Sequence, residues 1–166
     1  MEASWTVDQV MQDTERFLHG LGLPRMIRPD GLGTEYAFPT NVRQLTSLQL
    51  GELQLRLTAW FTYLLDVQGK EEAELGAVSA VFKIRLGVRV HELRATEGGR
   101  PPAQDVLEAL AVAEQGTDLR QLQQNIIARG VRVRRLEAQA KIYAEQLARL
   151  SREQSRRESE MRAPGA

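Results

Sequence analysis

The sequence predicts an all-α protein in which long antiparallel helices pack through heptad seams. Within residues 119–150, ten positions alternate steps of three and four without interruption, and residues 50–67 carry a shorter stripe of the same period. Only a helix has this period, and so narrow an apolar stripe needs a partner stripe in the same chain or in a neighbouring copy. Two seams exceed what one small monomer is expected to bury, so we expect a helical homo-oligomer, with a ring as one of its forms.

Residues 1–44 are expected to form a short N-terminal helix and an irregular arm. Thr6 is suited to cap a helix that ends near residue 23, and apolar side chains recur along it at helical spacing. Residues 24–43 hold three of the six prolines, so we expect a connector there rather than a packed element. Four apolar side chains of this arm are suited to docking on another surface: Met26, Ile27, Tyr36 and Phe38.

Residues 45–96 are expected to form a helical hairpin. Its first helix starts near Thr46 or Ser47 and ends near Gly69. The second segment is ambiguous, because residues 81–91 alternate apolar and polar side chains as a half-buried strand does. An acidic run at its start and apolar residues at helical spacing favour a helix. The seam of the first helix consists of Leu50, Leu53, Leu57, Trp60, Leu64 and Val67.

The C-terminal part is expected to be one long basic helix over residues 119–159. A linker with a short helix, residues 97–118, precedes it, and residues 160–166 are expected to fray. Gly116 to Asp118 offer a cap, and Ser151 begins a second capping pattern within the helix. The seam contains one charged residue, Arg129, which needs a partner or access to water. Its other oligomer-seam residues include Leu122, Ile126, Val133, Leu136, Tyr143 and Leu147.

The net charge of zero hides a division along the chain. Residues 1–119 hold eleven Lys or Arg against seventeen Asp or Glu, whereas residues 120–166 hold eleven against five. Two arginine clusters, within residues 129–135 and 149–157, are able to attract polyanions through phosphate neutralisation. The same arginines are equally able to pair with the acidic half of the same or a neighbouring subunit. The sequence leaves both interpretations open.

No known catalytic pattern is present. The chain has no phosphate-binding glycine loop, no zinc-protease motif and no cysteine, and His19 and His91 lack a metal-ligand spacing. We therefore expect neither an enzyme nor a cofactor. Trp60, Phe61 and Tyr63 are expected in the core rather than on a base-stacking platform. The absence of cysteine, of a signal-peptide pattern and of a membrane-length apolar run predicts a cytoplasmic protein without membrane contact.

The order of helices and two segments resemble small phage recombination mediators of the UvsY type. These segments are YAEQLARLSREQSRRESE at residues 143–160 and KIRLGVRVHELRA at residues 83–95, and the resemblance extends over residues 45–158. It implies a ring-forming helical protein in the host cytoplasm that binds single-stranded DNA. Such a protein helps a RecA-like recombinase to replace the single-strand-binding protein.

The resemblance also suggests which residues contact DNA. Arg89 stands where the family carries a DNA-contacting basic residue, and Gly87 stands where the family has a lysine, for which Lys83 and Arg85 are expected to compensate. The full expected interface consists of Lys83, Arg85, Arg89, Arg152, Arg156 and Arg157. The alternative function is a phage structural, scaffolding or DNA-packaging assembly protein that uses the heptads for oligomerisation. Subunit number, recombinase partner and preference for DNA over RNA are not specified by the sequence.

Overall fold

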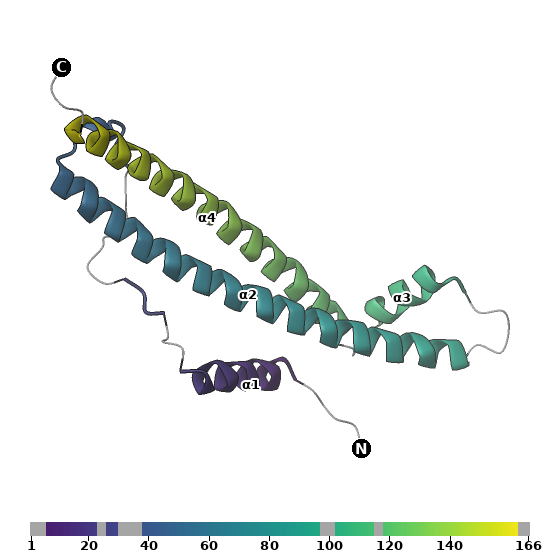
Figure 1. Cartoon of the computed structure of the whole chain (residues 1–166). Helices are drawn as coiled ribbons and strands as arrows, with labels where there is room; N and C mark the ends of the chain where they lie inside the picture. Colours follow the sequence, from purple (N-terminus) through teal and green to yellow (C-terminus); the bar gives the residue numbers. More distant parts are fainter. Residues whose placement is uncertain (1–5, 23–25, 30–37, 97–101, 115–117, 163–166) are drawn as a thin grey trace. The chain divides into compact units, whose positions relative to one another are not determined.

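The computed structural model describes residues 6–22, 26–29, 38–96, 102–114 and 118–162. Every regular element in these ranges is helical, as the sequence predicts. The elements are α1 (Val7–Gly20), the 3-10 helix η1 (Val42–Gln44), α2 (Ser47–Thr96), α3 (Gln104–Ala113) and α4 (Leu119–Arg162) (Figure 1). No helix in the described ranges is long and apolar enough to cross a membrane.

The contacts divide the chain into two units, and the long helices contribute to both. Unit 1 comprises Met1–Pro24 and Gly69–Val133, and unit 2 comprises Arg25–Gln68 and Arg134–Ala166. Unit 2 therefore contains residues 47–68 of α2 and 134–162 of α4, and unit 1 contains residues 69–96 of α2 and 119–133 of α4.

The helix α2 runs through 50 residues without a turn, which corrects the expected hairpin. A single glycine costs a helix interior only about 1 kcal/mol relative to alanine, and Gly69 alone does not end the helix. Gly69 also lacks the positive φ that a glycine often adopts where a helix ends, because in the described chain only Gly22, after α1, has a positive φ. Residues 81–91 are helical, so the strand alternative is excluded. The acidic run at residues 71–74 is consequently not a helix start.

In unit 2, the first half of α2 packs against the second half of α4. Leu50, Leu57 and Leu150 are almost completely buried and form the centre of this core. Leu50 lies near the start of α2 and Leu150 in the last third of α4, so the two halves run antiparallel (Figure 1). Partly buried side chains surround this centre: Phe38, Val42, Leu45, Leu53, Tyr143 and Leu147.

In unit 1, the short helix α3 covers the end of α2. Leu107 and Ala111 of α3 are fully buried against Val90 of α2 and Leu119 of α4. Residues 104–113 are helical, as the sequence predicts, and two apolar positions four residues apart supply the face that docks.

Part of the predicted seams lies in the core of unit 2, where Leu53, Tyr143 and Leu147 pack against Leu50 and Leu57. Leu50, Leu57 and Val133 are buried. The remaining seam residues are partly buried: Leu53, Trp60, Leu64, Val67, Leu122, Ile126, Leu136, Tyr143 and Leu147. The seam residues in the core of unit 2 are therefore covered within their own chain.

The predicted cap at Thr6 is present, and the start of α2 has a cap of the same kind. The amide nitrogen of Gln9 donates to Thr6 Oγ1 at 3.3 Å, and the Gln9 side chain accepts from the amide nitrogen of Thr6. Thr46 and Gln49 repeat this arrangement at the start of α2. Each exchange satisfies two amide groups that helix starts leave without a partner. The cap expected at residues 116–118 lies largely outside the described residues, as do Tyr36 and residues 163–166.

The helix α4 also departs from expectation in its second half. It runs without a break through Ser151, so the expected second cap is absent. Glu153 is buried, with 7% of its surface exposed, and it lies three residues beyond Leu150 on the same helical face. The inward face of α4 therefore continues past its last apolar residue into a charged one.

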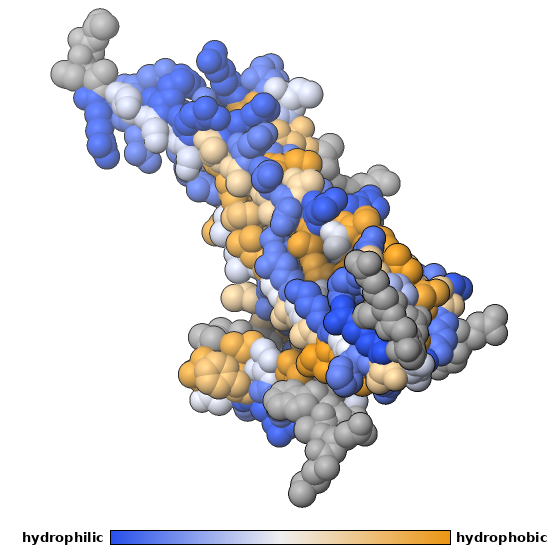
Figure 2. All heavy atoms as spheres, turned by 90° about the vertical axis from the view of Figure 1, so that its right-hand side faces the viewer, coloured by the Kyte–Doolittle hydropathy of each residue, from blue (hydrophilic) through white to orange (hydrophobic). Residues whose placement is uncertain are grey.

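Large apolar side chains also remain on the outside. Leu48 and Leu55 of α2 are each 74% exposed, and Ile127 and Val131 of α4 are more than half exposed. Figure 2 shows hydrophobic side chains at the surface among hydrophilic ones on one face of the molecule. In the arm, Ile27 is exposed, whereas Phe38 packs on the core of unit 2.

Candidate functional site

Two of the expected DNA-contacting arginines lie in ion pairs of unit 1. Arg85 is paired with Asp118, and Arg89 is paired with Glu114 and Glu92. The hydrogen bonds with Glu114 and then Glu92 raise the pKa of Arg89 above its ordinary value, and the bond with Arg89 lowers the pKa of Glu114. These guanidinium groups already have carboxylate partners, which a phosphate would have to displace.

The charged seam residue of α4 also has partners in unit 1. Arg129 pairs with Glu71 at 3.2 Å and with Glu74, and Arg132 lies 3.5 Å from Glu71. The Arg129 and Glu71 side chains are only 24% and 22% exposed. The acidic run of α2 therefore pairs with the seam arginine instead of compensating a helix dipole.

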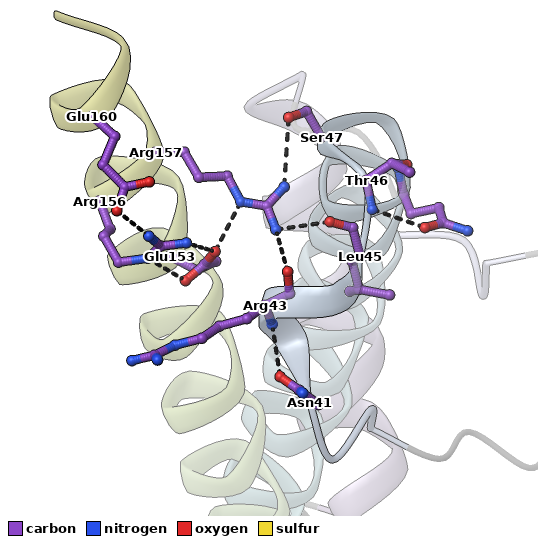
Figure 3. Close-up of polar contacts among 10 residues, drawn as sticks. Asn41, Arg43, Leu45, Thr46, Ser47, Glu153, Arg156, Arg157 and Glu160 are labelled. Atoms are coloured by element: carbon purple, nitrogen blue, oxygen red, sulfur yellow. Dashed lines mark hydrogen bonds and ion pairs between the residues drawn. The ribbon is translucent and has the colours of Figure 1, made fainter. Parts of the chain in front are cut away.

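In unit 2, Glu153 is the centre of a charged network near the end of α4. Arg156 contacts its carboxylate through Nη2 at 2.7 Å and through Nε at 3.0 Å, and Arg157 contacts it through Nε at 2.8 Å (Figure 3). Arg156 also pairs with Glu160. The hydrogen bonds with Arg156 and then Arg157 lower the pKa of Glu153 to about 2, so the carboxylate is charged at neutral pH.

Arg157 joins this network to the segment that precedes α2. Its Nη2 donates to the main-chain oxygen of Leu45 at 2.7 Å and to that of Arg43 at 3.3 Å (Figure 3). Its Nη1 lies 3.5 Å from Ser47 Oγ. With 17% of its side chain exposed, Arg157 has a structural position, although the sequence suggested a DNA contact.

Beside this network lies an open hollow of about 370 Å³, which we call the arginine hollow. One wall is the segment from Phe38 through η1, and the other is one face of α4. Arg149, Arg152 and Arg156 stand at i, i+3 and i+7 and therefore share that face. The hollow is lined by Phe38, Pro39, Thr40, Asn41, Val42, Arg43, Arg149, Arg152, Glu153 and Arg156.

Three of these arginines are available to a ligand. Arg43, Arg149 and Arg152 are exposed, and none has an acidic partner within the described part of the chain. Arg152 only donates Nε to the main-chain oxygen of Ala148 at 3.2 Å. In Figure 3 the Arg43 side chain extends from η1 toward α4. Asn41 fixes the base of η1, because its Oδ1 accepts from the Arg43 amide nitrogen at 3.2 Å.

The sequence named one of these three arginines as a site residue, Arg152. Arg149 has the same signal, since it belongs to the same cluster and stands three residues earlier on the same face. Arg43 is more than 100 residues away, and no sequence pattern connects it to α4. Lys83 is exposed on α2 in unit 1, so it does not belong to the arginine hollow.

No family model, curated protein or solved structure matches this chain. Within the described ranges no three His, Asp or Glu side chains are grouped as metal ligands. Trp60 stacks edge-on with Tyr63 at 6.0 Å and lies under the Arg28 guanidinium at 5.6 Å, so its ring already has neighbours on its edge and face. Exposed guanidinium groups around an open hollow are suited to bind a phosphate-bearing ligand.

Proposed function

We propose that this protein binds single-stranded DNA through phosphate contacts, without catalysing a reaction, as an accessory factor in DNA recombination. One observation carries the proposal: the part of α4 that belongs to unit 2, residues 134–162, exposes a row of basic side chains that have no acidic partner within the described residues. The row consists of Arg134, Arg135, Lys141, Arg149 and Arg152.

The contrast between the two units supports this interpretation. In unit 1, Arg85, Arg89 and Arg129 each have a carboxylate partner. In unit 2, the partly buried Arg157 serves the fold, whereas Arg149 and Arg152 are exposed and have no acidic partner in the described residues. A phosphate chain gains most where cations are not already neutralised, because binding then releases the counterions of the strand.

Affinity for a strand would come from several weak contacts. A single basic row gains little, but several copies of the chain in one assembly raise the effective concentration of each row for the bound strand. Such a surface can hold a strand extended and hand it over without consuming a nucleotide. A RecA-like recombinase and a single-strand-binding protein are the partners proposed for this transfer, on the basis of the segments at residues 83–95 and 143–160.

A second candidate function is a structural or scaffolding assembly protein of a phage. The exposed apolar side chains on α2 and α4 favour it, since Leu48 and Leu55 are three-quarters exposed although they are large. Apolar side chains in such positions are commonly covered by another protein molecule. The two candidates differ in whether the basic row has a ligand.

Fluorescence anisotropy with labelled single-stranded and double-stranded oligonucleotides, at several salt concentrations, distinguishes the two candidates. We expect single strands to bind, with a log–log salt slope of about −0.7 for each phosphate neutralised. Replacing Arg134 and Arg135 by Gln should weaken binding to a similar extent for every sequence, because phosphate contacts carry little base information. If no oligonucleotide binds at low salt, the DNA-binding proposal is wrong and the assembly function is favoured.

A further inference from the structure

We propose that the arginine hollow holds one nucleotide of the bound strand, with its phosphate between Arg43, Arg149 and Arg152. This inference rests on the proposed function and deepens it, because it assigns a specific pocket and a specific chemical group to the contact. The rest of the basic row then follows the neighbouring phosphates.

The geometry favours a single phosphate group over a diffuse charge interaction. Arg149 and Arg152 approach from α4, whereas Arg43 approaches from η1 on the opposite wall. Guanidinium groups from two walls can contact different oxygens of the same phosphate, and each can donate two parallel hydrogen bonds. A strand lying on a flat helix face would meet arginines from one side only.

Glu153 lies in the same hollow and would oppose an anion if its charge were uncompensated. Both of its oxygens are occupied, Oε1 by Arg156 and Arg157 and Oε2 by Arg156. The lining consequently keeps an excess of positive charge, with four arginines against one glutamate. Glu153 also orients Arg157, which holds the main chain of η1 through Arg43 and Leu45. It is therefore a positioning residue for the wall that carries Arg43.

The remaining lining indicates what is attached to the phosphate. Phe38, Pro39 and Val42 supply an apolar surface beside the arginines, and Thr40 and Asn41 supply polar groups. A sugar and an unpaired base have a flat apolar face and polar edges, which suit such a mixed surface. In a duplex the base faces are stacked inside the helix, so this hollow favours a single strand.

The first test compares two triple variants of equal charge. Arg43→Gln with Arg149→Gln and Arg152→Gln removes the hollow's free cations, and Arg16→Gln with Arg56→Gln and Arg120→Gln removes three exposed cations elsewhere. Because the three arginines together neutralise one phosphate, we expect the salt slope of the hollow variant to become shallower by about 0.7, which is about 5-fold weaker binding at about 0.1 M salt. The control variant should lose much less. Circular dichroism confirms folding, and single Arg149→Gln serves if the triple variant is not folded.

The second test changes the ligand and leaves the protein intact. A labelled oligothymidine, an abasic strand of equal length and inorganic pyrophosphate are compared on the wild-type chain. We expect the oligothymidine to bind several-fold more tightly than the abasic strand, and pyrophosphate to compete with it in the wild type but not in the hollow variant. Pyrophosphate binding without strand binding would identify a small phosphate compound as the ligand and overturn the inference.

The outcomes separate the inference from the function on which it rests. If the wild type binds single strands and both triple variants lose affinity equally, the nucleotide site is wrong while DNA binding stands. If the wild type binds no strand at all, the proposed function fails, and the nucleotide assignment fails with it.

Discussion

The guanidinium of Arg157 donates a 2.7 Å hydrogen bond to the main-chain oxygen of Leu45, which lies 112 residues earlier in the chain. This bond fixes the segment before α2 against the last turns of α4 within unit 2. Because the same guanidinium contacts Glu153, the two walls of the arginine hollow are connected through one side chain. The shape of the hollow therefore depends on a residue that does not line it.

Arg157→Gln should destabilise the protein by about 2 kcal/mol, because it removes charged hydrogen bonds to main-chain oxygens that are partly shielded from water. Arg156→Gln is the matched control. It changes the neighbouring arginine, whose contacts are confined to the carboxylates of Glu153 and Glu160 on its own helix. Urea denaturation followed by circular dichroism measures both, and an equal loss for the two variants would contradict the role assigned to Arg157.

The lowered pKa of Glu153 predicts a specific loss of stability in acid. Its ordinary value is 4.5 and its value in the folded protein is about 2, so the folded state favours the charged carboxylate. The stabilisation is complete above pH 4.5 and decreases as the pH falls toward 2, because the unfolded chain takes up the proton first. Urea midpoints of the wild type and Glu153→Gln, measured across this range, should converge as the pH falls. Parallel curves would show that Glu153 contributes no such dependence.

The helices were largely predictable because their signals are local. The apolar seams of α2 and α4 repeat over many turns. Thr6 and Thr46 are residues of a type that caps helix starts, and each caps one here. The sequence predicts that a helix ends at Gly69, but α2 continues for 27 residues beyond it. Tertiary packing and the surrounding helix formers outweigh one unfavourable residue.

The arginine hollow was only partly predictable because its walls come from distant parts of the chain. Arg149, Arg152 and Arg156 share a helical face, which spacing alone indicates. Arg43 joins them only through the packing of η1, and the carboxylates that neutralise Arg85 and Arg89 lie beyond α3. A count of basic residues therefore does not separate arginines that are paired within the fold from arginines that remain available.

Arg129→Leu should lower stability by about 1–2 kcal/mol, between the values typical of exposed and buried pairs. The substitution leaves Glu71 and Glu74 partly buried without their shared partner in the seam. Adding Glu71→Leu and Glu74→Gln should restore much of the lost stability, because no unpaired carboxylate then remains partly buried in the seam. Thermal unfolding measures both variants. A single Arg129→Leu variant that is more stable than the wild type would contradict the importance of this ion pair.

Arg89→Gln should affect the fold of unit 1 more than it affects the proposed DNA binding. Arg89 connects α2 to Glu114 at the end of α3, so its loss should lower the melting temperature. Lys83→Gln is the control, because Lys83 is exposed on the same helix and has no acidic partner in the described residues. Anisotropy with single strands should give similar salt slopes for Arg89→Gln and the wild type. A shallower slope for Arg89→Gln alone would instead support the DNA contact that the sequence resemblance implies.

Substitutions at Leu55 and Leu57 distinguish an effect on assembly from an effect on folding. The two residues are two positions apart in α2, but Leu55 is 74% exposed and Leu57 only 1%. Leu57→Ser removes a buried side chain and places a hydroxyl in the core of unit 2, which should cost about 3 kcal/mol or more. Leu55→Ser should change stability by less than about 0.5 kcal/mol, as is usual at exposed positions. If exposed apolar residues of α2 mediate self-association, Leu55→Ser should nevertheless shift the sedimentation coefficient toward that of an 18.7 kDa monomer. A wild type that already sediments as a monomer at micromolar concentration would defeat the homo-oligomer expectation. An unchanged oligomer in the Leu55→Ser variant would place the contact on another face.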